Sequence, residues 1–348
     1  MINGATILVE EKSDVIFTIQ TIVTKMKTIA IAAGGNSSEY GVSIKSAGEV
    51  QKRLAERYIT YVIVMRGHNW YWEDEKGRIH AIDKNDFTLT INDFKVRFDA
   101  VFIAIHGTPG EDGRLQGYFD MLSIPYTGCN VFTLSLTFNK EATKRYLEGS
   151  GIRMARSVLI RKGEEQEKRS SIEALGLPLF IKPNDSGSSF GVSKVKQTSE
   201  IDKALEDAFK ESNVVLAESF MKGTEVACGV VTTAKGKTVL PVTEIVSKNE
   251  FFDYEAKYTP GRSDEITPAR LPDEVMGKIQ STSLRISDML GCRGIVRVDF
   301  IIIDDEPWFL EINTVPGMTA ESIVPKQAEA HGLSLVDLYS MVIEDVCK

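Results

Sequence analysis

The sequence predicts an α/β protein, and three observations lead to this fold class. Short apolar segments typical of buried strands recur along the chain, and segments with helical periodicity lie between several of them. Near the C-terminus, two strongly apolar segments flank a polar turn, which is the pattern of a β-hairpin. At 348 residues, with 43% hydrophobic and 26% charged residues, the chain is long enough for two or three domains.

Composition excludes several classes of partner. The net charge is −8, and no run of Lys and Arg is long enough to follow a phosphate backbone, so we expect no nucleic acid partner. Four scattered cysteines without a CxxC pair indicate reduced thiols in the cytoplasm rather than disulfides or a zinc site. No apolar run reaches the roughly 18 residues that a membrane helix needs, so we expect no membrane partner.

Residues 1–25 read as an extension that is not part of the fold. They lack the basic start and uninterrupted apolar core of a signal peptide. Met26 is followed almost at once by a strand-like segment, Thr28–Ala33. We therefore expect translation to start at Met26, and residues 1–25 to be non-native or disordered and dispensable for activity.

Residues 26–128 are expected to form a first, small α/β layer domain. Thr28–Ala33 leads through two glycines into a helix, where Asn36 and Glu39 fit a capping box. Further strands are expected at 61–65 and 100–105, with helix-like segments between them. The loop HGTPGEDG at 106–113 precedes a helix from Arg114 to about Leu122.

Two more units, 129–217 and 218–348, complete the expected organisation. The first has a helix from Lys140 to Leu147, strands at 157–160 and 179–182, and a small-residue loop at 184–191. The second contains the hairpin and ends in an amphipathic helix, Leu335 to Val346. Between them, the polar, turn-rich segment 250–269 has the length of a functional lid rather than of a plain connector.

The hairpin segment RVDFIIIDDEPWFLEINTVPGM, at 297–318, carries the strongest functional signal. With a turn at 304–307, Arg297 and Asp299 share one face, as do Glu311 and Asn313, and position 299 comes opposite roughly 311 to 313, with slippage of a residue or two allowed. Two carboxylates and an amide oxygen beside a guanidinium suit Mg²⁺ bridging the phosphates of a nucleotide. The alternative is a surface hairpin with solvated charges, but unpaired charges in such apolar strands would be costly.

A loop of small residues after Lys182 could hold phosphate oxygens. Gly187, Ser188, Ser189 and Gly191 would let backbone N–H groups approach them, and the lysine supplies positive charge. The motif GxxxxGK[ST] occurs nowhere, and alone such a loop could be a surface turn. Its place ahead of the hairpin favours phosphate binding. Lys140 could be a second phosphate cation or simply a solvated lysine.

Residues 217–225 could bind the rest of a nucleotide. The carboxylate of Glu225 could accept hydrogen bonds from ribose hydroxyls, and the backbone from Glu218 to Phe220 could read the adenine edge. The alternative is an interdomain linker.

Two residues of the first domain leave their roles open. His106 stands where an apolar strand meets a glycine-rich turn, and a histidine there is more often structural than catalytic. Glu39 could be a cap carboxylate, or it could hold a substrate ammonium group because Gly34 and Gly35 allow close approach.

Taken together, these motifs resemble those of the D-alanine–D-alanine ligases of the ATP-grasp superfamily. The resemblance rests on HGTPGEDGRLQG at 106–117 and on the segment from Gly291 to Gly317. It is supported by GGNSSEYGVS at 34–43, IKPNDSGSSFGVSKV at 181–195 and FDYEAKY at 252–258. It implies a Rossmann-like, pre-ATP-grasp substrate domain followed by a two-subdomain ATP-grasp fold.

The resemblance also implies a reaction and a set of site residues. Two D-alanines would be joined at the expense of ATP, through an acylphosphate, to make peptidoglycan precursors in the cytoplasm, in a homodimer. Two Mg²⁺ ions, which Mn²⁺ could replace, would be bound by Asp299, Glu311 and Asn313. ATP would be held by Lys140, Lys182, Lys257, Glu218, Phe220 and Glu225. The amino acids and the oxyanion would be held by Glu39, Ser188, Tyr258, His106, Ser322, Arg297 and the Gly317 backbone N–H.

Two departures bear on specificity. Ser219 stands where many relatives have lysine, which leaves the adenine contacts at that position open. Tyr258 stands where relatives that make D-alanyl-D-lactate typically have phenylalanine, so it favours a dipeptide product. Alternatives are a ligase for another acceptor, such as D-serine or D-lactate, and a nucleotide-binding protein without ligase activity.

Overall fold

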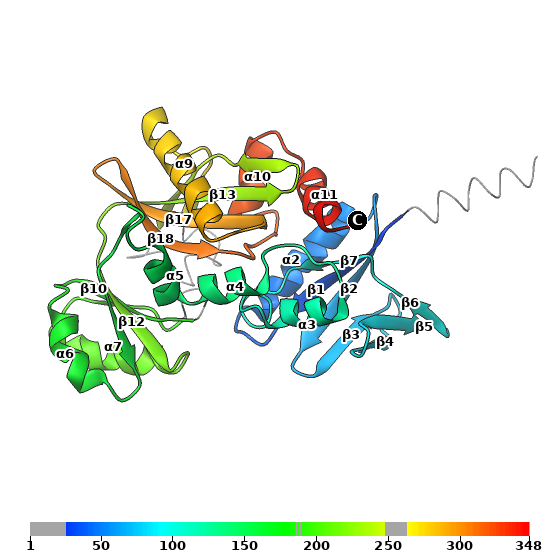
Figure 1. The fold of residues 1–348 in the computed structure, drawn as a ribbon, viewed down its shortest axis with the longest axis horizontal. Helices are drawn as coiled ribbons and strands as arrows, with labels where there is room; N and C mark the ends of the chain where they lie inside the picture. The colour runs from blue at the N-terminus through cyan, green and yellow to red at the C-terminus, as the bar shows by residue number, and fades with distance from the viewer. Residues whose placement is uncertain (1–25, 186, 188–189, 248–262, 348) are drawn as a thin grey trace, which may run out of the picture.

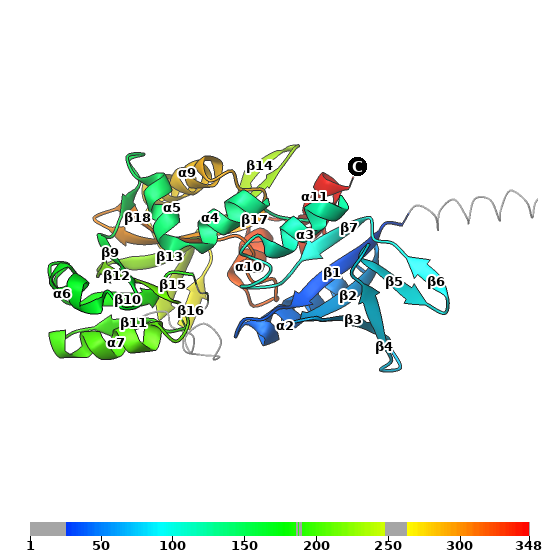
Figure 2. The same ribbon diagram turned by 60° about the horizontal axis from the view of Figure 1, so that its bottom comes forward.

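The structure, a computed structural model, describes residues 26–185, 187, 190–247 and 263–347. Within these residues the chain forms three β-sheets with helices packed on them (Figures 1 and 2). The predicted α/β class is confirmed. None of the helices in the described ranges has the length and apolar character that crossing a membrane would require.

The first sheet is built on β1 (Thr28–Gly34), which pairs in parallel with β2 (Ile59–Arg66) and β7 (Ala100–Ile103). Helix α2 (Tyr40–Leu54) connects β1 to β2 and buries Ala47, Val50 and Leu54 against the sheet. Residues 104–105, expected in the last strand, lie beyond the end of β7.

The segments between β2 and β7, expected to be helix-like, are four strands, so that expectation was wrong. They are β3 (Asn69–Glu73), β4 (Ile79–Asp83), β5 (Thr88–Ile91) and β6 (Phe94–Val96), which continue the sheet as antiparallel hairpins. The turn between β5 and β6 places Asn92 and Asp93 at φ 47° and 67°, the left-handed geometry of a tight hairpin.

The expected capping box at the start of α2 is also absent from the structure. Helix α2 begins only at Tyr40, and its N-cap residue, Glu39, makes no side-chain cap. The Oδ1 atom of Asn36 instead accepts a hydrogen bond from the backbone N–H of Gly67, at 2.7 Å. The polar side chain therefore fastens the loop after β1 to the turn after β2.

The second sheet is antiparallel and has the order β11–β10–β12–β9. Its strands are β9 (Ser157–Arg161), β10 (Leu179–Pro183), β11 (Ser193–Val195) and β12 (Val214–Ser219). Helices α6 (Glu165–Glu173) and α7 (Ile201–Ala208), the latter preceded by the 3₁₀ turn Thr198–Glu200, pack on one face. The other face is left for the site described below.

The third sheet carries the hairpin and has the order β16–β15–β13–β17–β18–β8 in the described residues. Its strands are β8 (Arg153–Met154), β13 (Thr224–Thr233), β15 (Thr243–Ser247), β16 (Ser263–Ile266), β17 (Gly294–Ile303) and β18 (Glu306–Asn313), and β14 (Gly236–Val239) pairs with β13. Helix α9 (Asp273–Met289) packs on its outer face through Val275, Ile279 and Ile286.

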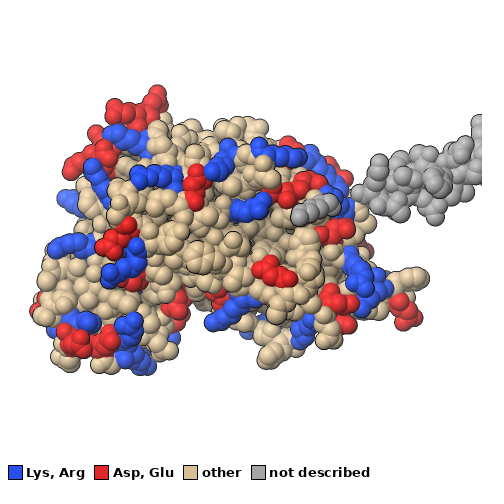
Figure 3. All heavy atoms as spheres, in the orientation of Figure 1, with Lys and Arg blue, Asp and Glu red and all other residues tan. Residues whose placement is uncertain are grey.

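Helices also join the three sheets. Helices α3 (Arg114–Leu122), α4 (Val131–Phe138) and α5 (Lys140–Leu147) lead from the first sheet to the other two, and α10 (Ile323–Ala330) and α11 (Leu335–Val346) follow the hairpin. Helix α11 returns to the first sheet, where Leu338 and Tyr339 pack with Ile31 and Phe102 (Figure 1). On the face shown in Figure 3, acidic and basic side chains are interspersed.

Candidate active site

The register of the hairpin confirms the predicted arrangement of its polar residues. Asp299 lies opposite Glu311, and Arg297 lies opposite Asn313. The turn is shorter than expected, because Asp304 and Asp305 alone make it, at φ 51° and 60°, and β18 already begins at Glu306.

A β-bulge next to Asp299 was not predicted and shapes the site. Asp299 pairs with Glu311, but Phe300 pairs with Phe309, so Leu310 is the additional residue on β18. Phe309 consequently enters the core beside Phe300, at a centroid distance of 6.4 Å, while Leu310 lines the pocket above the sheet.

Asp299 is the centre of a buried polar group. Arg297 donates to both of its carboxylate oxygens, through Nε and a terminal nitrogen, at 2.7 Å each. Asn313 Nδ2 donates to Asp299 Oδ2 at 2.9 Å. Asp299 is 4% exposed, so this pairing keeps a buried carboxylate satisfied.

This group has the donor chemistry that a magnesium ion requires. Asp299, Glu311 and Asn313 offer oxygen atoms from one face of two paired strands, and the last two line the pocket. Among the residues that the structure describes, no cluster of three or more His, Cys, Asp and Glu side chains could hold a metal. A metal bound here would therefore depend on two carboxylates, one amide oxygen and oxygens of a ligand.

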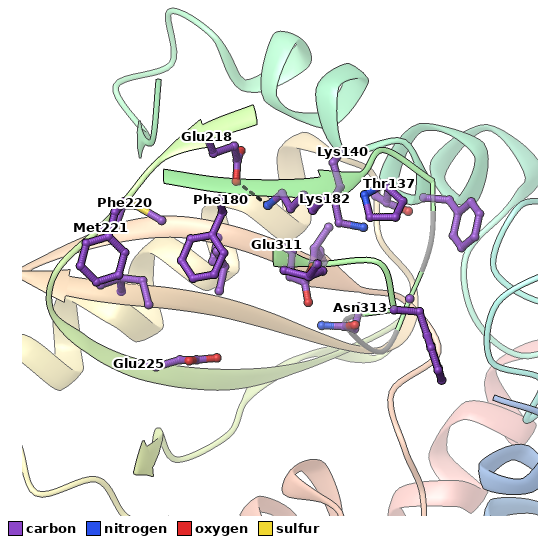
Figure 4. Close-up of a pocket in the computed structure, with 18 of the residues that line it drawn as sticks. Thr137, Lys140, Phe180, Lys182, Glu218, Phe220, Met221, Glu225, Glu311 and Asn313 are labelled. Atoms are coloured by element: carbon purple, nitrogen blue, oxygen red, sulfur yellow. Dashed lines mark ion pairs between the residues drawn. The ribbon is translucent and has the colours of Figure 1, made fainter. Parts of the chain in front are cut away.

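A cavity of about 260 Å³ lies between the second and third sheets. Most of the predicted nucleotide residues line it: Lys140, Lys182, Glu218, Phe220, Glu225, Glu311 and Asn313. Figure 4 shows Phe180, Phe220 and Met221 towards one end of the cavity, and Lys140 and Asn313 towards the other, with Glu311 between them. The cavity thus has an apolar end suited to a base and a charged end suited to phosphates.

The apolar end contains residues that the sequence analysis missed. Phe180 lies 6.0 Å from Phe220 between ring centroids, and Lys194 Nζ lies 4.3 Å from the Phe220 centroid. The sequence did contain a signal for Phe180, because it precedes Lys182 by two positions on β10 and so shares its face.

Glu218, which lines this cavity, is held by two lysines, of which Lys182 also lines it. Lys144 Nζ donates to one carboxylate oxygen at 2.5 Å, and Lys182 Nζ forms an ion pair with the other. Burial opposes the ionisation of Glu218, but the two adjacent ammonium groups hold its pKa below the ordinary value. Lys144 was not predicted as a site residue.

A second group of predicted residues lies where the first sheet meets the other two. His106 is buried, and its Nδ1 donates to the carbonyl oxygen of Val315 at 2.8 Å while Nε2 lies 3.2 Å from Ser46 Oγ. Burial lowers the pKa of His106, although Glu39 lies near it. His106 therefore has a structural role, because its ring joins the segment after β18 to helix α2.

Glu39 lies close to Gly187, in the small-residue loop that follows β10. A Cβ atom added to Gly187 would lie 2.5 Å from Glu39 Oε2, so only glycine permits this approach. Glu39 is 7% exposed. The contact brings the start of α2 against the loop that follows β10.

Glu111, also missed, connects the two groups of residues. Its carboxylate accepts hydrogen bonds from the backbone N–H groups of Gly107, at 2.6 Å, and Val315, at 3.2 Å, and it lines the cavity. Burial, and then the negative charge of Glu39, raise the pKa of Glu111 to about 8. The sequence did contain a signal for Glu111, because it is a carboxylate within the glycine-rich segment HGTPGEDG.

The remaining predicted residues follow β18 or lie outside the described residues. A Cβ atom on Gly317 would lie 2.8 Å from Ser322 Oγ, and Ser322 is the N-cap residue of α10. Ser188, Lys257 and Tyr258, with residues 250–262 of the expected lid, lie outside the described residues.

Two sheets enclose the pocket, with Lys182 on one of them, an acidic hairpin on the other, and Lys140 at the start of α5. This arrangement defines an ATP-grasp enzyme. Comparison with known families specifies it further. Residues 28–129 match the family described as D-ala D-ala ligase N-terminus, and residues 147–344 match D-ala D-ala ligase C-terminus. The chain belongs to the D-alanine–D-alanine ligase family.

Individual relatives agree with this assignment. The chain is 50% identical over 321 residues to the D-alanine--D-alanine ligase of Phocaeicola vulgatus, covering 92% of this chain and 99% of that one. The VanG D-Ala:D-Ser ligase from Enterococcus faecalis superposes with a TM-score of 0.82 at 33% identity, over 92% and 99% of the two chains. The D-alanine--D-alanine ligase from Bacillus anthracis complexed with ATP gives 0.72 at 28% identity, over 92% and 97%.

Proposed function

We propose that this protein joins two D-alanine molecules into D-alanyl-D-alanine, with ATP converted to ADP and phosphate, to supply peptidoglycan precursors. The observation that carries the proposal is a cavity in which Lys140 and Lys182 face the acidic hairpin, in a chain that belongs to the ligase family. It is thus a ligase that forms a carbon–nitrogen bond.

ATP would lie with its base at the apolar end of the cavity. Phe180 and Phe220 offer ring faces to adenine, Glu218 can accept from its exocyclic amine, and Glu225 can accept from ribose hydroxyls. Lys140 and Lys182, with Lys257, would neutralise the phosphates. Lys182 is paired with Glu218 in the structure, so it must exchange that partner for a phosphate oxygen.

Asp299, Glu311 and Asn313 would hold two Mg²⁺ ions, or Mn²⁺ in their place, against the phosphates. When bound, such ions offset negative charge on the transferring phosphoryl group. The protein's own contribution is to fix three oxygen donors on paired strands, since the hydrogen bonds to Asp299 hold that side chain in place.

The chemistry at the amino acids follows from their charges. A carboxylate is a poor electrophile, so an oxygen of the first D-alanine takes the γ-phosphoryl group from ATP and becomes an acylphosphate, with ADP as the leaving group. The amine of the second D-alanine, once deprotonated, attacks the carbonyl carbon. The tetrahedral oxyanion then collapses with release of phosphate.

Residues around the junction of the sheets would position these groups. Glu39 would bind the first ammonium group, in a hydrogen-bonded set that would include Ser188 and Tyr258, with His106 nearby. Ser322, at the N-terminus of α10, would bind the second carboxylate, as expected for an anion at a helix start. Arg297 and the Gly317 N–H would stabilise the oxyanion.

The acylphosphate also needs protection from water. A lid was predicted at 250–269, but residues 263–266 form strand β16, so the lid would be limited to the part of this segment before β16. It would exclude water, with 26–128 as the substrate domain and with 129–217 and 218–348 holding ATP. We further propose a homodimer acting in the cytoplasm, where ATP is supplied.

One assay tests the central proposal. The protein is incubated with ATP, Mg²⁺ and D-alanine, and separately with L-alanine, and products are identified by mass together with released phosphate. We expect the dipeptide and equimolar phosphate with D-alanine alone. ATP binding without phosphate release stimulated by D-alanine would refute ligase activity.

A second candidate acceptor is D-serine, favoured by the likeness to the D-Ala:D-Ser ligase from Enterococcus faecalis. Supplying D-alanine with equal D-serine or D-lactate separates the possibilities by product mass. We expect D-alanyl-D-alanine to dominate.

The variant Tyr258→Phe should gain measurable D-lactate product at neutral pH, and an unchanged product ratio would count against the role given to Tyr258.

A further inference from the structure

The carboxylate of Glu218 forms ion pairs with two lysine side chains. Its carboxylate is 5% exposed and lies between two ammonium groups, Lys182 from β10 and Lys144 from α5. These two are the charged groups that act on Glu218 in the described structure. The two lysines differ in their access to the cavity.

Lys182 lines the cavity, whereas Lys144 lies outside its described lining. The Lys144 side chain is 11% exposed. Its Nζ also donates to the carbonyl oxygen of Ala155, at 2.9 Å, beyond the end of β8. Lys144 is therefore anchored by Glu218 and the Ala155 carbonyl, and it does not line the cavity in which a nucleotide would bind.

Helix α5 separates the tasks of its two lysines by one turn. Lys140 and Lys144 are four residues apart, so they project from the same face of the helix. Lys140 lines the cavity, and Lys144 points to Glu218. Helix α5 thus places Lys140 at the charged end of the cavity and Lys144 beside Glu218, the carboxylate that would face adenine.

We propose that Lys144 is a positioning residue for nucleotide recognition: it keeps Glu218 charged and aimed at the adenine amine when Lys182 leaves for the phosphates. The inference rests on the proposed ATP site and deepens it. Without Lys144, binding ATP would strand Glu218 as a buried carboxylate without a cation, which is costly. Without ATP, Glu218 would still keep Lys182, so the cost falls on binding rather than on folding.

The same geometry specifies which base is accepted. An ionised carboxylate accepts a hydrogen bond from the exocyclic amine of adenine, but it repels the carbonyl oxygen that inosine carries at that position. Lys144 therefore sets the preference for ATP over ITP through Glu218, although it contacts neither nucleotide.

The test measures binding of ATP and ITP by calorimetry, with Mg²⁺ and without D-alanine, and KM and kcat in the ligation assay. For K144M we expect the Kd and KM for ATP to rise about tenfold or more, which is about 1.4 kcal/mol. The value of kcat and the KM for D-alanine should change little, and the ratio of ITP to ATP affinities should approach one. The matched control is R145M, because Arg145 is the next residue of α5 and its side chain is 71% exposed.

A double-mutant cycle with E218Q separates positioning from a general loss of charge. In the E218Q background, K144M should cost little further affinity, because no buried carboxylate remains to be stranded. If K144M does not fold, K144Q removes the same charge and retains a donor for the Ala155 carbonyl.

Each outcome decides the matter. Unchanged ATP affinity and an unchanged ITP to ATP ratio in the lysine variant, or an equal penalty in the E218Q background, would overturn the assignment. A wild-type protein that binds ATP but makes no dipeptide would refute the proposed ligation while leaving the binding test intact.

Discussion

At the scale of single residues, Arg297 must do two things at once. In the structure its guanidinium pairs with both oxygens of Asp299, which holds that carboxylate on the face of the hairpin. In the proposed reaction the same group also donates to an oxyanion. A planar fork with five N–H donors can serve both acceptors, whereas an ammonium group is a single point of charge.

We therefore expect Arg297→Lys to lower kcat by about 10²–10³ while the KM for ATP stays close to the wild-type value. Steady-state kinetics with ATP as the varied substrate, at saturating D-alanine, gives both quantities. Arg293→Lys is the matched control, because Arg293 precedes the same strand and pairs with Asp345 at the surface. Equal kcat for the two variants would contradict the oxyanion role.

At the same scale, contacts between residues far apart in the sequence could not be predicted from the sequence alone. The pairing of Asp299 with Glu311 could be predicted, because a short turn fixes the register between neighbouring strands. The contacts of Glu218 with Lys144 and Lys182 could not, since three separate elements must first be placed in space. Glu111 was missed for the same reason.

At the scale of elements, local signals worked where one helix or hairpin carries its own start and stop. Helix α5 illustrates this: Asn139 Oδ1 accepts from the N–H of Ala142 at 2.8 Å, so the helix begins at Lys140 as predicted. The strands β3–β6 were mistaken for helices because they are short and half-exposed, and they pair through cross-strand contacts such as that of Trp72 on β3 with His80 on β4.

Loss of the cap on α5 should affect ATP binding as well as stability. Asn139→Ala is expected to lower the free energy of unfolding by about 1 kcal/mol and to raise the KM for ATP, because Lys140 is the first residue of the helix. Ser334→Ala removes the comparable cap of α11, where Ser334 Oγ accepts from Asp337 N at 3.1 Å. Chemical denaturation and kinetics should show similar losses of stability but a raised KM only for the first variant.

A substitution in the turn of the hairpin should instead raise the stability of the protein. Asp305 has φ 60°, a conformation that glycine adopts without steric cost. We expect Asp305→Gly to raise the free energy of unfolding by up to about 1 kcal/mol with unchanged activity. Asp305→Val should destabilise the protein. If the midpoints of thermal unfolding of the two variants shift in the same direction, the left-handed conformation of Asp305 is contradicted.

At the scale of the whole molecule, the cavity joins sheets that have separate cores. Ile181 and Val215 belong to the core of the second sheet, and Val298 and Phe300 to that of the third. A ligand held by both sheets should therefore stabilise the molecule as a unit, by about 2.7 kcal/mol at a concentration 100 times its Kd.

This linkage gives a prediction for the metal. ATP with Mg²⁺ should raise the midpoint of thermal unfolding, and a chelator added with ATP should remove most of the increase. Asp299→Asn should lose the metal-dependent part, whereas Asp305→Asn, at the turn of the same hairpin, should keep it. A full increase for the Asp299 variant would exclude this carboxylate as a ligand.

The packing of α11 on the first sheet has a consequence during synthesis. Ile31 and Phe102 are covered by Leu338 and Tyr339, which the ribosome produces long after the strands they shield. At elongation rates of about 5–20 residues per second, that apolar surface waits on the order of ten seconds or more for its cover. The nascent amino-terminal half should therefore be a client of chaperones that hold unfinished chains, and its yield should depend on how fast translation is completed.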